Sequence, residues 1–211
     1  MRIFRIPPIL FKLFPQIYWR DSVATNQVYL TFDDGPDPRF IPKILNILQK
    51  QSAQATFFVL GNKAARNEKL IKQIHQEGHE IGIHSFIHEH LFLQSKNHIY
   101  DQLDQSKKII EQIIEQPVCY FRPPFGTFSP RLIKICTDLK LKIVMWSLLT
   151  YDFDVRISSH SILKLISDSV KSGEILVFHD GHKNSDRTIE ILESVILMLK
   201  EKGLKLISIA K

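Results

Sequence analysis

The sequence predicts an α/β fold built on a parallel sheet or a barrel of parallel strands. About seven short apolar segments, typical of buried strands, alternate along the chain with segments of helical period. Polar clusters follow these strands rather than precede them, and the carboxyl ends of parallel strands meet on one face. At 211 residues the chain is long enough for one well-buried domain and short for two. We therefore expect an N-terminal segment over residues 1–25 and a single domain over residues 26–211.

The first half of the pattern begins with a strand that ends in two carboxylates. The stretch VYLTFDDGPDP at 28–38 is apolar up to Asp33 and Asp34, and a Gly-Pro turn follows. The apolar spacing predicts further strands over residues 53–60 and 79–84, and helices over residues 40–50, 63–76 and 97–116.

The second half repeats the alternation without a linker or a low-complexity segment. Pro117 stops the long helix, and a Ser cap at Ser158 begins a later one. The predicted strands cover residues 118–122, 142–148, 174–178 and 204–209, and the predicted helices cover residues 130–139, 158–171 and 184–202.

Composition and charge exclude several classes of protein. The chain is 44% hydrophobic and 24% charged, which is ordinary for a globular protein. Its net charge of +6 suits an anionic surface or polymer, but no basic run is interleaved with aromatic residues, so nucleic acid is not expected as a partner. Cys119 and Cys136 lie far apart without a CxxC spacing, which indicates two buried thiols rather than a disulfide framework. A monomer is the default expectation.

The first twenty residues carry four basic residues and no acid. Prolines and Lys12 break their apolar run, which is too short for a spanning helix and has no cleavage site of a signal peptide. The sequence therefore favours a cytoplasmic or membrane-peripheral location. We expect the apolar side chains of this segment to cover the closed end of the domain; weak contact of residues 1–20 with a membrane surface is the alternative. These side chains are Ile3, Phe4, Ile9, Leu10, Phe11 and Phe14.

The acidic pair indicates a metal site. Adjacent carboxylates repel each other unless they share a metal or a proton. Asp33 and Asp34 point to opposite sides of an extended backbone, so one can bind a cation while the other acts differently. His84 and His88 are four residues apart, and on a helix capped by Ser85 both imidazoles would reach one ion. Two histidines and one carboxylate are the ligand set of a catalytic zinc site with an open position.

Five motifs in this order carry a family resemblance. TFDDGP, ATFFVLG, GHEIGIHSFIHEHL, RPPFG and ILVFHD resemble the polysaccharide deacetylases, the NodB-homology domain of carbohydrate esterase family 4. The resemblance covers about residues 28–210. It implies a distorted, incomplete (β/α) barrel of about seven parallel strands. It also implies removal of N-acetyl groups from a carbohydrate partner, a glycan containing N-acetylglucosamine such as peptidoglycan or chitin.

The resemblance assigns roles to individual residues. It gives Asp34, His84 and His88 as ligands of one divalent metal ion, with Zn²⁺ expected and Co²⁺, Ni²⁺ or Mn²⁺ as alternatives. His90 lies off the face of His84, and we expect it either at the surface or beside the metal ligands without binding the metal.

The catalytic groups follow from the same motifs. Asp33 matches the general base and His179 the general acid of the family. Arg122 matches the residue that orients the base, and the backbone N–H of Phe125 matches a donor to the oxyanion. These roles suit the chemistry, since a histidine titrates near neutrality and a guanidinium keeps a carboxylate ionised.

The substrate contacts are less constrained. We expect Pro124, Phe125, Phe153 and Val177 to contact the substrate, with Phe153 and Val177 as an apolar wall for the acetyl methyl group. Trp146 is expected in the core.

The chain departs from the family at its fourth motif, WSLLTYDFD. Leu149 stands where the family has an Asp that tunes the catalytic histidine, so the partner of His179 stays open. The three candidates are Asp152, Asp154 and Asp180.

Other functions remain as alternatives at this point. One is a catalytically weakened carbohydrate-binding relative, and another is an O-acetyl esterase on a different acetylated polysaccharide. A Mg²⁺ phosphotransfer site on the acidic pair is a poor match, because two histidines would join it and no Gly-rich phosphate loop is present.

Overall fold

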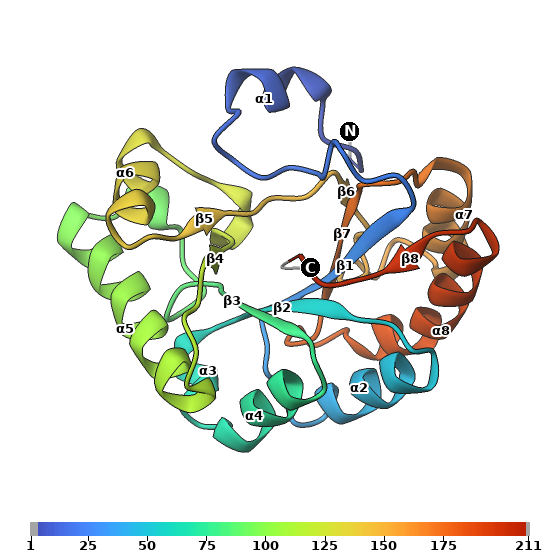
Figure 1. Cartoon of the computed structure of the whole chain (residues 1–211), viewed down its shortest axis with the longest axis horizontal. Helices are drawn as coiled ribbons and strands as arrows, with labels where there is room; N and C mark the ends of the chain where they lie inside the picture. Colours follow the sequence, from blue (N-terminus) through green and yellow to red (C-terminus); the bar gives the residue numbers. More distant parts are fainter. Residues whose placement is uncertain (1–3, 210–211) are drawn as a thin grey trace.

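The sheet of this protein curls into a barrel that does not close on itself. A computed structural model describes residues 4–209. The strand order is β5-β4-β3-β2-β1-β7-β6, with β8 paired to β1, and the paired strands are parallel. Helices surround the curled sheet (Figure 1). The predicted α/β class and the incomplete barrel are therefore confirmed.

The strands are short, and most lie near their predicted positions. Their bounds are β1 (Gln27–Asp33), β2 (Ala55–Val59), β3 (Glu80–Ile83), β4 (Tyr120–Phe121), β5 (Lys142–Ile143), β6 (Leu148–Leu149), β7 (Ile175–His179) and β8 (Lys205–Leu206). The prediction of one strand over 142–148 was wrong, because two short strands replace it. The backbone between them bonds elsewhere: the Met145 amide donates to the Tyr18 carbonyl (2.9 Å).

The predicted helices keep their order with shorter bounds, and α1 (Pro8–Leu13) is a helix that the sequence analysis did not predict. The other helices are α2 (Ile41–Lys50), α3 (Gly61–Ala64), α4 (Glu68–Gln76), α5 (Lys96–Ile114), α6 (Pro130–Asp138), α7 (Ser159–Ser169) and α8 (Asp186–Glu201), with short 3₁₀ turns at η1 (Leu91–Leu93) and η2 (Pro124–Gly126). The predicted helix over 63–76 is divided into α3 and α4. Ser95, Ser129 and Ser158 cap α5, α6 and α7 by accepting a backbone N–H in the first turn. None of the helices within residues 4–209 has the length and apolar character needed to cross a membrane.

Apolar side chains fill the space between the curled sheet and the helices around it, and a smaller apolar cluster lies on the inner face of the sheet. From Val28 to Asp33 every residue of β1 is buried, because sheet and helices cover both of its faces. Phe32 stacks on Phe57 with ring centroids 5.0 Å apart, and Phe178 lies beside Phe32. This packing fixes β1, the strand whose end carries Asp33 and Asp34.

The two cysteines are free thiols. Cys136 is buried as expected, whereas Cys119 is exposed, so the expectation of two buried thiols was wrong for Cys119.

The N-terminal segment lies across the open side of the barrel (Figure 1). On one side the Tyr18 amide donates to the carbonyl of Ile143 in β5 (2.8 Å). On the other side the Leu149 amide of β6 donates to the carbonyl of Phe4 (2.8 Å). The segment therefore covers the gap between the two edge strands, and the expectation that it covers the closed end of the domain was wrong.

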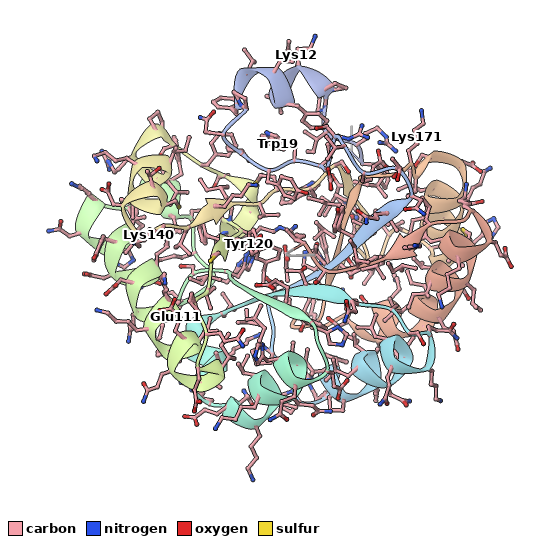
Figure 2. All side chains as sticks on the ribbon, in the orientation of Figure 1. Lys12, Trp19, Glu111, Tyr120, Lys140 and Lys171 are labelled. Atoms are coloured by element: carbon pink, nitrogen blue, oxygen red, sulfur yellow. The ribbon has the colours of Figure 1, made fainter. Side chains whose placement is uncertain are left out.

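The side chains of this segment divide between the core and the surface. Four of the expected apolar residues are partly buried and pack against the core, and these are Phe4, Leu10, Phe11 and Phe14. Ile9 is exposed, and Ile3 lies outside the described residues. Lys12 also points away from the molecule (Figure 2).

Candidate active site

A cavity of about 390 Å³ lies at the carboxyl ends of the strands. Its lining comprises Asp33, Asp34, His84, His88, Pro123, Phe125, Gly126, Trp146, Leu149, Phe153, Val177, His179 and His182. The polar clusters that follow separate strands thus meet at one place, as their positions in the sequence predicted.

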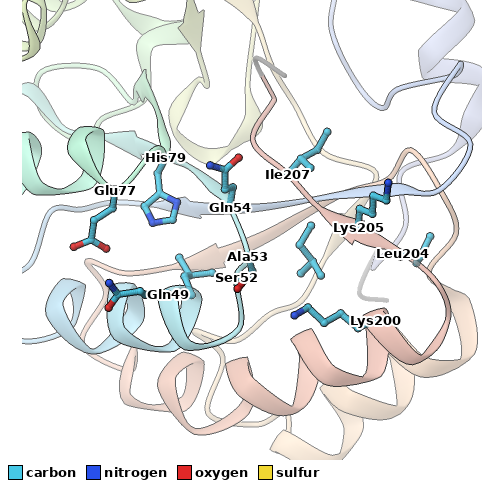
Figure 3. A pocket seen from close by; sticks show the side chains of 12 residues that line it. Gln49, Ser52, Ala53, Gln54, Glu77, His79, Lys200, Leu204, Lys205 and Ile207 are labelled. Atoms are coloured by element: carbon cyan, nitrogen blue, oxygen red, sulfur yellow. The ribbon is translucent and has the colours of Figure 1, made fainter.

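A second cavity, of about 610 Å³, lies on another part of the molecule (Figure 3). Gln54 and His79 line it just before β2 and β3, together with Lys200 at the end of α8. Within residues 4–209, the group of three side chains able to hold one metal ion lies in the smaller cavity. The smaller cavity is therefore the candidate active site.

Asp34, His84 and His88 form that group. Their ligand atoms lie within 4.8 Å of one another, and Asp34 Oδ1 is 3.4 Å from His84 Nε2 and 3.3 Å from His88 Nε2. Asp34 Oδ1 is buried without a hydrogen-bond partner among the described residues. A buried carboxylate oxygen that faces two imidazole nitrogens fits a divalent cation, and one carboxylate with two imidazoles is a donor set that zinc accepts.

The loop after β3 brings the two histidines together without a helix. The predicted helix capped by Ser85 is absent, because Ser85 has a left-handed backbone conformation (φ 76°) and the chain bends through His88. Gln102 of α5 supports this loop by accepting hydrogen bonds from the Ile87 amide (3.1 Å) and the Ser85 hydroxyl (3.3 Å). The sequence analysis missed Gln102, although a polar residue on the apolar stripe of a helix is a visible signal.

His84 is oriented by a backbone carbonyl. Its Nδ1 lies 2.7 Å from the carbonyl oxygen of Arg122, and a carbonyl can only accept, so Nδ1 carries the proton. In the neutral ring Nε2 then keeps its lone pair, and this is the atom that faces Asp34 and His88. Such a contact fixes the tautomer that a metal ligand needs.

The charges of the three groups agree with this arrangement. Burial raises the pKa of Asp34, but the close approach of the His84 ring and the charge of His179 outweigh it, so the pKa of Asp34 falls below its usual range. Burial also lowers the pKa of His88, which favours its neutral form. An ionised carboxylate beside a neutral imidazole is the state in which both can donate electron pairs.

Lys63 of α3 holds the backbone of Asp34. Its ammonium donates to the carbonyl of Asp34 (2.7 Å) and lies 3.3 Å from the carbonyl of Gly181. Asp34 itself has a positive φ of 76°, and a Cβ on Gly181 would lie 2.1 Å from the Asp34 carbonyl oxygen. Lys63 therefore ties the turn after β1 to the turn after β7.

Replacing Lys63 with Met is expected to weaken metal binding about 10-fold, because the turn that carries Asp34 loses its cationic support. Metal titration against a competing chelator measures the change. Lys72→Met on the exposed side of α4 is the matched control and should bind metal as the wild type does. Unchanged affinity in the Lys63 variant would show that Asp34 does not depend on this contact.

Asp33 forms a buried ion pair with Arg122. The guanidinium donates to Asp33 Oδ1 at 2.7 Å, and the two side chains are 3% and 0% exposed. Arg122 also donates to the Thr31 hydroxyl (2.6 Å) and to the carbonyl of Met145 (2.9 Å). Its guanidinium lies 4.1 Å from the ring centroid of Phe58. The pair is therefore part of the core rather than a surface contact, and it fixes the direction of Asp33.

His179 has Asp152 as its partner. Asp152 Oδ1 lies 2.8 Å from His179 Nδ1, and Asp152 Oδ2 accepts from the His179 amide at 2.7 Å. The Thr188 hydroxyl donates to Asp152 Oδ2 (2.5 Å), and Asp152 is 1% exposed. Leu149 therefore does not leave His179 unpaired. Burial lowers the pKa of His179, but the charge of Asp152 and its hydrogen bond raise it more, to about 9.

The two other candidate partners of His179 do different things. Asp154 pairs with Arg156 at the surface (2.8 Å). Asp180 is fully buried and its carboxyl oxygens have no hydrogen-bond partner among the described residues. Burial raises the pKa of Asp180 well above its usual value, and the negative charge of Asp34 raises it further.

The walls of the cavity are mainly apolar. Phe153, Val177 and Phe125 line it as expected, whereas Pro124 is buried in η2 and its neighbour Pro123 lines the cavity instead. Trp146 packs against the core as expected, and it also lines the cavity.

The ring of Phe125 stands at the mouth of the cavity. It is 51% exposed and stacks on His90 with ring centroids 3.8 Å apart, and His90 is at the surface as expected. The backbone of Phe125 has a positive φ of 58°.

Comparison with known proteins assigns this site to a family. The family model described as polysaccharide deacetylase matches residues 20–144. A peptidoglycan-N-acetylglucosamine deacetylase of Bacillus cereus is 32% identical over 206 residues, which cover 95% of this chain and 95% of that protein. The chain belongs to the polysaccharide deacetylase family. It is also 33% identical to a chitooligosaccharide deacetylase of Azorhizobium caulinodans over 163 residues, or 75% of this chain and 77% of the relative.

Solved structures agree with the family. A crystal structure of a peptidoglycan N-acetylglucosamine deacetylase superposes with a TM-score of 0.89 at 27% identity and covers 97% of this deacetylase and 95% of that chain. A carbohydrate esterase family 4 pseudoenzyme from Bacillus anthracis superposes with a TM-score of 0.83 at 31% identity, over 91% of this chain and 66% of that one. This deacetylase spans 38% of PgdA of Listeria monocytogenes, a longer relative that is 31% identical.

Proposed function

We propose that this enzyme removes N-acetyl groups from a glycan that contains N-acetylglucosamine and releases acetate. One observation carries the proposal: a single cavity holds a buried carboxylate fixed by Arg122, a three-ligand metal group and a histidine paired with Asp152. Relatives named for peptidoglycan and chitooligosaccharide deacetylation support the substrate class. A divalent cation held by Asp34, His84 and His88 belongs to the proposal, with Zn²⁺ expected.

The geometry suits hydrolysis of an amide. A divalent cation held by Asp34, His84 and His88 would polarise the acetyl carbonyl and lower the pKa of water from 15.7 to roughly 7. Asp33 accepts the proton as water attacks the carbonyl carbon, and Arg122 keeps the Asp33 carboxylate ionised and aimed. The Phe125 amide would donate to the carbonyl oxygen as negative charge develops there.

His179 completes the reaction on the other side of the cavity. Asp33 and His179 are register partners on the adjacent strands β1 and β7, so base and acid flank one position. As the carbon–nitrogen bond breaks, His179 gives its Nε2 proton to the departing amine, while its Nδ1 remains bonded to Asp152. The free amine and acetate are the products.

The methyl group of the acetyl would lie against the apolar wall of the cavity. Leu149, Phe153 and Val177 supply apolar surface to the cavity. A methyl group buried there is removed from water, while the carbonyl faces the polar groups. Leu149 thus contributes to the wall rather than to proton transfer.

An acetate-release screen of the metal-loaded enzyme tests the proposal. Chito-oligosaccharides, peptidoglycan, acetylxylan and nucleotide-linked sugars are the substrates. We expect acetate from chito-oligosaccharides or peptidoglycan. Release from acetylxylan alone would instead show an O-acetyl esterase, and binding of chito-oligosaccharides without release at any metal loading would contradict the proposal.

Replacing Asp152 with Asn is expected to lower kcat/KM by on the order of 10²-fold, because His179 loses the charge that keeps it protonated. The raised pKa of about 9 places the alkaline limit of the wild-type profile near that pH. The variant should lose activity at a lower pH than the wild type, since its His179 loses the proton at a lower pH.

The pair of His179 and Asp152 also affects stability. It stabilises the fold fully below pH 6.5, and this contribution disappears as the pH rises through about 9.

The pH profile of kcat/KM measures the shift. Asp154→Asn is the matched control, because Asp154 was an alternative partner and pairs with Arg156 instead. An unchanged alkaline limit in the Asp152 variant, or an equal shift in the control, would remove Asp152 from its role.

A further inference from the structure

His182 lies in the turn after β7 and lines the active-site cavity. It is not a member of the metal-ligating group, and the proton transfers described above do not use it. Its own amide donates to the hydroxyl of Ser185 (3.1 Å), and its Nδ1 accepts from the amide of Asn184 (3.2 Å). The ring is thus fixed by its own turn.

This contact determines which ring nitrogen of His182 carries a proton. A backbone amide can only donate, so the Nδ1 that receives the Asn184 N–H has a free lone pair. The proton of the neutral ring is therefore on Nε2. Nε2 forms no hydrogen bond with another described residue and is not among the buried polar atoms without a partner, so it is open to the solvent.

The surroundings place this donor beside the apolar wall. The Asn184 side chain donates to the carbonyl of Phe153 (2.7 Å), which ties the turn of His182 to the loop that carries the wall. The Phe153 ring contacts His179 on one side (4.7 Å between centroids) and His182 on another (5.9 Å). His179 and His182 thus both contact the Phe153 ring in an edge-to-face arrangement.

A sugar that presents its acetamide to His179 would bring other groups past Phe153. These groups are hydroxyls, which accept as well as donate hydrogen bonds. Burial and the positive charge of His179 lower the pKa of His182, which agrees with the neutral ring that its Asn184 contact requires.

We propose that His182 binds substrate by donating its Nε2–H to a hydroxyl oxygen of the glycan held in the cavity. The inference rests on the proposed function, because it deepens the description of the same site. His182 is a specificity residue in this scheme: it contacts the sugar and takes no part in breaking the carbon–nitrogen bond.

Three substitutions of His182 separate the contributions of its hydrogen-bond donor, its hydrogen-bond acceptor and the shape of its ring. His182→Asn keeps an acceptor near the position of Nδ1 and loses the distant donor. His182→Gln can place an amide N–H near the position of Nε2, and His182→Phe keeps only the ring. His160→Asn, on the exposed start of α7, is the matched control.

The probe is tetra-N-acetylchitotetraose, with binding followed by calorimetry and turnover by acetate release on the metal-loaded protein. The Asn and Phe variants should raise Kd and KM about 3- to 10-fold, the effect of one neutral hydrogen bond, with kcat within about twofold of the wild type. The Gln variant and the control should stay within about twofold in every parameter.

Deoxy sugars identify the acceptor. With the analogue that lacks the contacted hydroxyl, wild type and His182→Asn should bind equally, because the contact is absent from both. A merely structural role would weaken binding of every analogue alike and would move kcat as well.

Several results would overturn the inference. They are unchanged Kd in the Asn variant, an equal loss in the Gln and Asn variants, a fall in kcat at constant KM, or a loss that persists with every deoxy analogue. Binding by the wild type without acetate release would remove the proposed reaction and leave the binding test of His182 intact. Failure of the wild type to bind the probe would overturn both.

Discussion

Replacing Asp33 with Asn is expected to reduce acetate release about 10²- to 10⁴-fold while leaving metal binding intact. Asn has the shape of Asp but cannot accept a proton from water. Asp34, His84 and His88 remain in place, since Asp33 turns toward Arg122 rather than toward the metal-ligating group.

The measurement pairs kinetics with metal content. His84→Ala should lose both activity and metal, because His84 presents Nε2 to the site. Asp138→Asn on the surface of α6 is the matched control and should behave as the wild type. Loss of metal from the Asp33 variant would assign Asp33 to the ligands and leave the base unidentified.

Replacing Arg122 with Met is expected to lower the free energy of unfolding by about 3–5 kcal/mol. Arg122 is 0% exposed, and its removal leaves the Asp33 carboxylate buried without a counter-charge. The carbonyls of Val144 and Met145 also lose their donor. Activity should fall with stability, since the remaining Asp33 is no longer aimed.

Denaturant unfolding of a double variant separates the effect of the unpaired Asp33 charge from the effect of the other lost Arg122 contacts. The double variant Asp33→Asn, Arg122→Met should lose less stability than Arg122→Met alone, because the unpaired charge is gone. Arg156→Met breaks an ion pair at the surface and should cost far less stability than Arg122→Met, because solvent screens the exposed charges. If the Arg156 variant were as unstable as the Arg122 variant, burial would not be the reason for the effect.

The sequence predicted the fold class and the catalytic face because both follow from local patterns. Apolar runs that alternate with helical periods define the order of strands and helices, and the residues after each run reach one face of the sheet. Asp34, His84 and His88 meet as expected, since β1 and β3 are separated only by β2 in the sheet.

The errors come from contacts between distant parts of the chain. The left-handed conformation of Ser85 is supported by Gln102, which lies on another helix. The strand predicted over 142–148 is divided where Met145 bonds to Tyr18. No local pattern around Ser85 or Met145 reports these partners.

The partner of His179 illustrates the same limit. From spacing alone, Asp152, Asp154 and Asp180 were equally good candidates for the partner of His179. Asp152 is distinguished by the amide and ring of His179 and by the hydroxyl of Thr188, and these groups come from β7 and α8. Only the assembled fold brings those two elements to one carboxylate.

The N-terminal segment, which crosses the open side of the barrel, also supports the wall of the active site, so a shortened version of this enzyme would lose that support. Phe4 packs on Tyr151 with ring centroids 4.9 Å apart, and Tyr151 packs on Phe153 of the active-site wall (5.6 Å). A protein trimmed to residues 26–211 would lose this buttress and would present unpaired backbone on β5 and β6, where other chains can add a strand. Residues 4–25 therefore cover two strand edges and also support the wall against which we place the acetyl group.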